Sequence, residues 1–206
     1  MKRDFFIIRH GETDKNVQGV WQGSGTEALL NNNGKKQASE LAEKVKELDL
    51  SCIYCSPLLR AVQTANIIVQ NRSSVLPVII LQDLRECHFG KSEGLTFDAT
   101  KKEYGEDFIQ KILFPNRKTW YLRFPEGECK CDVFERVFNA LNKIAQNSNT
   151  KKDTSVGIIC HAGVLNALQC GFGLRDVCYD NCSILHLCYD TATDSWSQVF
   201  DLNKPS

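Results

Sequence analysis

The chain has 206 residues, of which 24% are charged and 42% hydrophobic, a composition typical of a globular domain and not of a disordered segment. Lys plus Arg and Asp plus Glu both number 25, so the formal net charge is zero. This balance argues against nucleic acid or a membrane surface as a partner, because both recruit proteins through an excess of cations. The length favours a single domain, which we take as residues 1–206.

Ten cysteines are the unusual feature of the composition. The apolar run from Phe5 to Ile8 is too short for a signal-peptide core or a membrane span, so we expect a cytoplasmic protein with reduced thiols. Cys52 and Cys55 form a CxxC pair, but residues three apart on a strand point to opposite faces. The other closely spaced pairs are Cys129 with Cys131 and Cys178 with Cys182. None of these has a second pair at zinc-finger spacing, so we expect mostly buried thiols and no metal site.

Short apolar runs alternate with 3.6-residue periodicity along the chain, which predicts strands and helices in turn. In chain order we expect a strand at 5–8, a helix at 34–48, a strand at 53–55, a helix from about Pro57 to Ile68, a strand at 76–81, one or two short helices within 97–114, a helix at 132–146, a loop at 147–153, a strand at 155–160, a helix at 163–171, and strands at 183–188 and 195–200. Asn31 to Asn33 are N-cap candidates for the first helix. The segment at about 95–128 is irregular, and we expect it to cover the substrate. Crossovers long enough for helices predict a three-layer α/β/α fold with a mostly parallel central sheet.

Reactive side chains follow the predicted strands, where ligands of such sheets bind. Arg9 and His10 follow the first strand, Arg60 comes shortly after the second, Glu86 after the third, and His161 follows the strand at 155–160. Two guanidinium groups can grip phosphate oxygens bidentately, and an imidazole can act as a nucleophile. A carboxyl group can protonate the leaving oxygen and later accept a proton from water. The set therefore favours phosphoryl transfer without a metal or another cofactor.

The motifs that carry these residues resemble the histidine phosphatase superfamily, in the branch with the phosphoglycerate-mutase-like fold. The resemblance rests on four blocks in the family's order: 7–13 followed by Asn16, 56–65, 84–94 and 161–164. It implies that His10 is the phosphorylated nucleophile. It also implies that Arg9, Arg60 and His161 form the phosphate pocket and that Glu86 is the proton donor.

The resemblance and the spacing also suggest substrate contacts beyond the phosphate. Asn16 matches a family position that adds a phosphate contact, and Gln22 and Gly23 fall in a loop that lies against the substrate in relatives. Ala162, next to His161, is a further candidate. His88 shares a face with Glu86 if its loop is extended, so substrate contact and loop packing both stay open for it.

Three positions depart from the family pattern. Ser92 stands where a Trp is common, Cys129 replaces a Ser, and Leu29-Leu30-Asn31 replaces a Pro-Leu-Thr run. None belongs to the implied phosphate pocket, but they prevent a transfer of substrate identity. Arg85 should diverge from Glu86 on an extended segment, which predicts a surface or salt-bridging role for it, and His186, inside an apolar strand, is predicted to be structural.

The preferred function is a metal-independent phosphatase acting on a small phosphorylated metabolite, with phosphoserine, a phosphoglycerate and a sugar phosphate all left open. The alternative is a cofactor-dependent phosphoglycerate mutase, which the short stretch at 86–128 disfavours because mutases of this family usually carry a longer insertion there. A non-catalytic relative is disfavoured because the full set of site residues is present. A homodimer is left open as the oligomeric state.

Overall fold

The computed structural model describes residues 2–147, 155–174 and 178–198, in which six strands form one sheet in the order β3-β2-β4-β1-β5-β6. The strands are β1 (Lys2–Arg9), β2 (Leu50–Cys55), β3 (Val78–Ile80), β4 (Ser155–Cys160), β5 (Ile184–Asp190) and β6 (Ser195–Gln198). The first four are parallel to one another, while β5 pairs antiparallel with β1, and β6 with β5. The fold is therefore α/β, and its mixed sheet has the predicted parallel centre.

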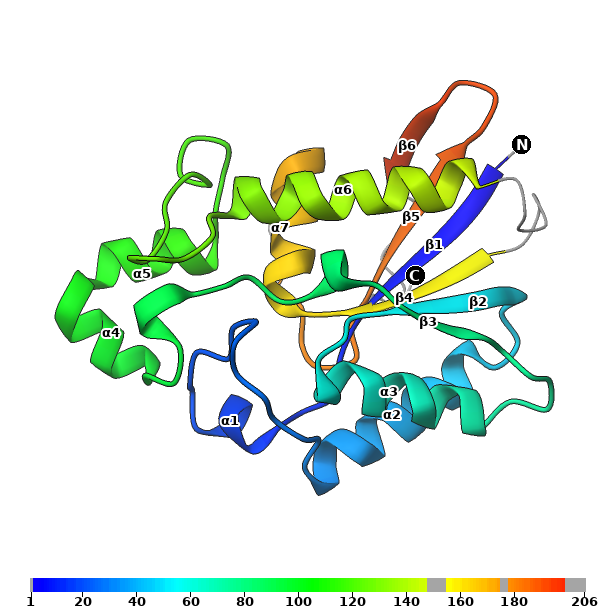
Figure 1. The fold of residues 1–206 in the computed structure, drawn as a ribbon, viewed down its shortest axis with the longest axis horizontal. Helices are drawn as coiled ribbons and strands as arrows, with labels where there is room; N and C mark the ends of the chain where they lie inside the picture. The colour runs from blue at the N-terminus through cyan, green and yellow to red at the C-terminus, as the bar shows by residue number, and fades with distance from the viewer. Residues whose placement is uncertain (1, 148–154, 175–177, 199–206) are drawn as a thin grey trace.

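Helices cover both faces of the sheet (Figure 1). They are α1 (Asp14–Val17), α2 (Asn32–Val45), α3 (Leu59–Gln70), α4 (Phe97–Tyr104), α5 (Glu106–Leu113), α6 (Lys130–Gln146) and α7 (Ala162–Phe172). Side chains of β1 alternate between two cores: Phe6 and Ile8 pack with α2 and α3, whereas Phe5 and Ile7 pack with α6 and α7. Both faces of the strand are buried, which explains its uninterrupted apolar run. The three-layer arrangement predicted from the sequence is confirmed.

Local chemistry explains where several elements begin and end. The Asn31 side chain accepts a hydrogen bond from the Gly34 N–H at 2.7 Å, so α2 starts at Asn32, two residues before its predicted start. The next helix starts at Leu59, after Pro57 and not at it. The predicted strand at 76–81 is only Val78–Ile80, because Pro77 has no N–H to extend the ladder.

The segment at 95–128 contains two short helices, α4 and α5, which lie beyond one end of the sheet (Figure 1). They meet at Gly105, whose φ of 88° is accessible to glycine without strain. Trp21 anchors this segment, since its ring packs against Phe97 and Phe124 and its Nε1 donates to the Thr100 hydroxyl at 2.9 Å. Residues 148–153 of the predicted loop at 147–153 and residues 199–200 of the predicted strand at 195–200 lie outside the described residues.

The cysteines are free thiols, most of them buried. Cys52 packs in the core beneath α6 and Cys55 in the core beneath α2 and α3, so the CxxC pair faces opposite ways as predicted. Burial raises the pKa of Cys55 and of Cys87 to about 12, which keeps both protonated. Among the described residues there is no cluster of three His, Cys, Asp or Glu side chains arranged to hold a metal ion. Within the same residues, no helix combines the length and apolar character needed to cross a bilayer.

Candidate active site

Three adjacent parallel strands bring the predicted residues to one edge of the sheet. The His10 N–H donates to the Cys160 carbonyl at 3.0 Å, and the Ser56 N–H donates to the Ile159 carbonyl at 2.9 Å. These bonds place the ends of β1, β4 and β2 side by side. The rings of His10 and His161 consequently lie with their centroids 5.2 Å apart.

Arg60 and Arg9 are both held by backbone carbonyl groups. Arg60, in the first turn of α3, is fully buried and donates from Nη1 to the Thr26 carbonyl at 2.9 Å and from Nη2 to the Gln22 carbonyl at 3.2 Å. Arg9 donates from Nη1 to the Tyr179 carbonyl at 2.7 Å. Since carbonyl groups carry no net charge, neither guanidinium is neutralised by these contacts, and both remain available to an anion.

His10 is buried and has a defined tautomer. Its Nδ1 lies 2.7 Å from the Gly11 carbonyl oxygen, which can only accept, so Nδ1 carries the hydrogen and Nε2 keeps a lone pair. Burial lowers the pKa of His10 well below its usual value, and the positive charges of Arg60 and Arg9 lower it further. The imidazole is therefore neutral at physiological pH, the state in which its Nε2 is nucleophilic.

His161 is the second buried imidazole. Its Nε2 lies 2.7 Å from the Ser56 hydroxyl oxygen, and its buried Nδ1 has no hydrogen-bond partner. Burial, followed by the charge of Arg60, holds the pKa of His161 well below its usual value. A bound anion would oppose these effects, since a nearby negative charge favours the protonated ring.

Unpartnered buried nitrogens concentrate around this edge. Within the described part of the chain they include Nε of Arg9, Nε of Arg60, Nε2 of Gln22 and Nδ1 of His161. A buried polar group without a partner costs about 1–3 kcal/mol. Arg9 and Gln22 line a cavity at this edge, so their unpartnered atoms indicate a site that a ligand completes. Three of the four atoms belong to basic side chains, a composition that favours an anion as the ligand.

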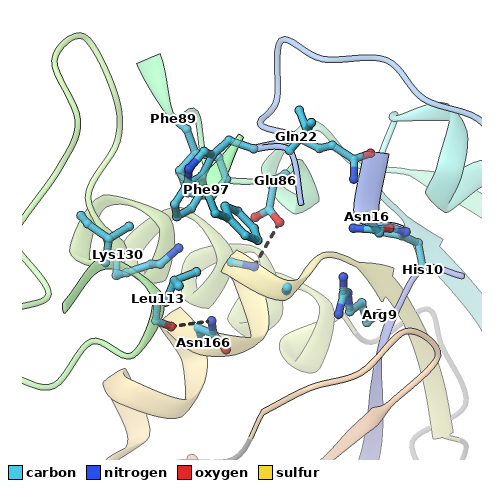
Figure 2. Close-up of a pocket in the computed structure, with 15 residues that line it drawn as sticks. Arg9, His10, Asn16, Gln22, Glu86, Phe89, Phe97, Leu113, Lys130 and Asn166 are labelled. Atoms are coloured by element: carbon cyan, nitrogen blue, oxygen red, sulfur yellow. Dashed lines mark hydrogen bonds between the residues drawn. The ribbon is translucent and has the colours of Figure 1, made fainter. Parts of the chain in front are cut away.

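A cavity of about 100 Å³ opens at this site (Figure 2). Its lining includes six predicted residues, namely Arg9, His10, Asn16, Gln22, Glu86 and Ala162. Ala162 is the first residue of α7, and the N-terminus of a helix favours anions through its free N–H groups. The cavity adjoins a second one of about 410 Å³ that shares Arg9, Asn16 and Ala162. Arg60 and His161 are fully buried and do not form part of the lining.

Asn16 and Gln22 present amide N–H groups to the cavity. The Thr13 N–H donates to Oδ1 of Asn16 at 3.0 Å, and the Thr13 hydroxyl donates to Oε1 of Gln22 at 2.8 Å. Because both amide oxygens already accept hydrogen bonds, the Nδ2 and Nε2 groups are the donors left for a ligand.

Glu86 is positioned by backbone hydrogen bonds. Its Oε1 accepts from the Cys87 N–H at 2.7 Å, and its Oε2 accepts from the Gly163 N–H at 3.1 Å. Position 163 has no space for a side chain, since a Cβ there would lie 2.2 Å from Oε1 of Glu86. The carboxyl group is thereby fixed against the first turn of α7, at the cavity wall.

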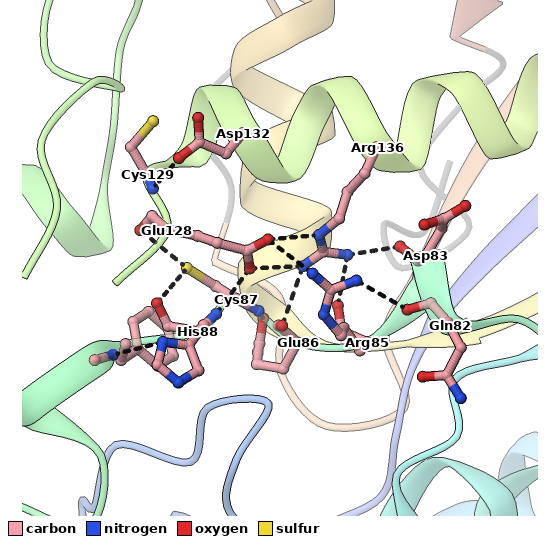
Figure 3. A network of polar contacts seen from close by, with 12 residues as sticks. Gln82, Asp83, Arg85, Glu86, Cys87, His88, Glu128, Cys129, Asp132 and Arg136 are labelled. Carbon is pink, nitrogen blue, oxygen red and sulfur yellow. Dashed lines mark hydrogen bonds and ion pairs between the residues drawn. The ribbon is translucent and has the colours of Figure 1, made fainter. Parts of the chain in front are cut away.

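Arg136 of α6 holds the backbone that carries Glu86 (Figure 3). Its guanidinium donates to the carbonyl groups of Asp83, Arg85 and Glu86 at 2.6, 2.9 and 3.1 Å. It also forms a two-pronged ion pair with Glu128, at 2.9 and 3.1 Å. Burial acts to raise the pKa of Glu128, but the hydrogen bonds and charge of Arg136 outweigh it and the pKa is lowered.

Three other residues singled out in the sequence lie outside the cavity lining. The His88 side chain is 44% exposed and packs in its own loop, with Nδ1 lying 3.1 Å from the Glu126 carbonyl oxygen and 3.2 Å from the Gly90 nitrogen. Gly23 lies against Glu93, where a Cβ would come within 1.8 Å of Oε1. Arg85 forms an ion pair with Glu128 at 3.2 Å, which confirms its predicted salt-bridging role.

Several further residues line the cavity that were not singled out as site residues in the sequence. Lys130 and Asn166 come from helical segments and carry no motif of their own, and Phe89 and Phe97 form apolar walls. Only Lys130 has a hint in the sequence, as the lysine that follows the Glu128-Cys129 pair, and nothing in that pattern predicts its burial.

The fold places the chain among phosphoglycerate-mutase-like α/β proteins. It superposes on a phosphoglycerate mutase from Bacillus anthracis with a TM-score of 0.83 at 21% identity, covering 96% of this chain and 92% of that one. The Bacillus stearothermophilus protein YhfR gives a TM-score of 0.83 at 25% identity, with 99% and 98% covered.

Sequence comparisons define the family. The model of the histidine phosphatase superfamily (branch 1) matches residues 5–201. The uncharacterized phosphatase PhoE of Bacillus subtilis is 33% identical over 162 residues, which cover 79% of this chain and 73% of the relative. The chain belongs to the histidine phosphatase superfamily, and it is a phosphatase, a hydrolase of phosphoric monoesters.

Proposed function

We propose that the protein hydrolyses a small phosphorylated metabolite through a phosphohistidine on His10, without a metal ion. The observation that carries this proposal is the buried, neutral His10, with its hydrogen on Nδ1 and two unneutralised guanidinium groups close by. A neutral nucleophile flanked by cations suits attack on a phosphate dianion, because the cations offset the charge of the incoming group.

The reaction has two steps. In the first, Nε2 of His10 forms a bond to phosphorus while the ester P–O bond breaks, and Glu86 supplies the proton that the leaving alcohol takes up. In the second, Glu86 accepts a proton from water as the water oxygen bonds to phosphorus and the P–N bond breaks, which frees His10 and inorganic phosphate. Arg9, Arg60 and His161 stabilise the charge on the phosphoryl oxygens in both steps, and Asn16 and Gln22 add neutral donors.

Phosphate release across a panel of phosphomonoesters tests the proposal. The panel contains phosphoserine, a sugar phosphate, and 3-phosphoglycerate with and without 2,3-bisphosphoglycerate. We expect release in the presence of a chelator and a fall of at least about 1,000-fold in His10→Ala, since the covalent route is lost. Rapid quenching with labelled substrate should trap an acid-labile, alkali-stable phosphoprotein in the wild type and none in His10→Ala.

His186→Asn is the matched control, because His186 lies on β5 and bonds to Asp4 at 2.8 Å. It should retain the activity of the wild type. Phosphate release that survives intact in His10→Ala would overturn the mechanism, and a chelator-dependent activity would show that a metal is required. Isomerisation of 3-phosphoglycerate faster than its hydrolysis would reassign the enzyme as a mutase. The cytoplasmic location and the oligomeric state stay predictions.

A further inference from the structure

Lys130 is a buried cation without an anionic partner in the described part of the chain. It is the first residue of α6, and only 5% of its surface is exposed. Its Nζ lies 5.0 Å from the centroid of the Phe89 ring, and it forms no ion pair with any described carboxylate. Burial of an ammonium group is costly unless an anion compensates it, so its position at the cavity wall points to a ligand anion.

Glu86 lies close to Lys130 but forms no ion pair with it among the contacts of the described residues. A methyl group on Gly163 would lie 2.2 Å from Oε1 of Glu86 and 3.1 Å from Nζ of Lys130, so the two charged groups flank the same point above α7. Hydrogen bonds from the backbone N–H groups of Cys87 and Gly163 orient the two oxygens of Glu86 towards α7. Lys130 therefore faces the cavity beside the proton donor without pairing with it.

Its place in the cavity defines which part of a substrate it meets. In Figure 2, Lys130 reaches into the pocket from the side opposite Arg9, His10 and Asn16. Phosphate held by His10 leaves the alcohol portion next to Glu86, and beyond Glu86 lies Lys130. The walls at that end are the apolar side chains of Phe89, Ile112 and Leu113, which leaves Lys130 as the cation available there.

We infer that Lys130 binds a carboxylate on the alcohol portion of the substrate, so that the site prefers phosphorylated hydroxy acids over phosphate esters of neutral alcohols. One ammonium among apolar walls balances the charge of a singly charged carboxylate, whereas a phosphate dianion would leave a net negative charge at this end of the cavity. The inference rests on the proposed phosphatase reaction and assigns Lys130 as a specificity-determining residue within it.

Paired substrates that differ by one carboxylate test the inference. 3-Phosphoglycerate is compared with glycerol 3-phosphate, and phosphoserine with phosphoethanolamine, in the wild type and in Lys130→Met. The wild type should favour the carboxylate of each pair, and Lys130→Met should reduce the ratio of kcat/KM values by about 10- to 100-fold, mainly through KM, because a charge-assisted contact is lost. Lys91→Met is the matched control, since Lys91 is exposed and paired with Glu126 at 2.9 Å, and the ratio should not change.

Several results would overturn the inference. If the wild type does not prefer the carboxylate of each pair, or if the ratio of kcat/KM values is unchanged in Lys130→Met, Lys130 does not recognise the carboxylate. A glycerol 1,3-bisphosphate hydrolysed better than 3-phosphoglycerate would identify the second anion as a phosphate. Failure of the phosphatase mechanism itself has a different signature, namely phosphate release that does not depend on His10.

Discussion

We expect Gly163→Ala to lower kcat while leaving the free energy of unfolding nearly unchanged. The added methyl group would lie 2.2 Å from Oε1 of Glu86 and 3.0 Å from its Cδ, whereas ordinary contacts begin near 3.4 Å. The carboxyl group must therefore withdraw by about 1 Å, which disturbs the hydrogen bonds from Cys87 and Gly163. General acid–base catalysis contributes about 100- to 10,000-fold, and a shift of this size in the proton donor can remove the lower part of that range.

We therefore expect kcat for an alkyl phosphate to fall by about 100-fold. The free energy of unfolding should change by less than about 1 kcal/mol, because alanine is the better helix former at this position in α7 and offsets part of the clash. The assay combines steady-state phosphate release, chemical denaturation and the burst of nitrophenol from p-nitrophenyl phosphate. That burst should slow by less than about 10-fold, since its leaving group needs little protonation.

Glu86→Gln and the double variant complete the test. If the methyl group acts by displacing Glu86, the double variant should be no slower than Glu86→Gln alone, because both changes remove one function. A folded Gly163→Ala enzyme with wild-type kcat on the alkyl ester would refute the assignment of Glu86 as the proton donor in this position. Additive losses in the double variant would refute the proposed link between the two residues.

Three further predictions follow from the same contacts. Arg136→Met removes the two-pronged partner of Glu128, which keeps its ion pair with Arg85, and takes a donor from three backbone carbonyl groups, so the free energy of unfolding should fall by about 3 kcal/mol and kcat should fall with it. A change in denaturation below about 1 kcal/mol would contradict the role of Arg136. Arg60→Lys cannot reproduce the two guanidinium contacts that hold the loop at 22–26, so kcat/KM should fall by about 100-fold or more. If inorganic phosphate inhibits the variant and the wild type with the same inhibition constant, Arg60 does not belong to the phosphate pocket. Burial and the nearby cations lower the pKa of His10 and His161 in the folded protein, so protons bind more readily to the unfolded chain below about pH 6.5. Stability should therefore fall as the pH drops from 6.5 towards 5, by up to about 1.4 kcal/mol per pH unit for each histidine, and His10→Gln should flatten the slope measured by urea denaturation.

The fold was predictable because its signals are local. The run at 5–8 is apolar on both sides, which requires burial on both faces of a strand and hence helices above and below it. The bounds of β3 were not predictable to the residue, since they depend on which residues pair with β2 across the sheet. In the same way, Pro57 is compatible with the start of a helix, but the helix begins at Leu59.

The candidate site likewise contains residues that local sequence signals predict and residues whose role depends on tertiary packing. Arg9, His10 and His161 directly follow strands, and parallel strands bring their carboxyl ends to one edge whatever the details of packing. Lys130 and Arg136 lie one to two turns apart on a single helix, and only the packing of α6 beside Glu86 gives either a role. For His88, the extended loop assumed from the sequence would face the substrate, whereas the observed loop turns the ring towards Gly90 and Glu126.

Local patterns along the chain were sufficient to predict the order of strands and helices, the reactive residues that follow the strands, and the family to which they belong, because these depend on periodicity and on neighbours along the chain. Three features required the folded structure: the neutral state of His10, the two backbone N–H groups that hold Glu86, and a buried Lys130 that forms no ion pair among the described residues although the net charge is zero. Each of these features depends on how far a group is buried from water and on which residues distant in the sequence lie beside it. Neither can be deduced from the local pattern of residues.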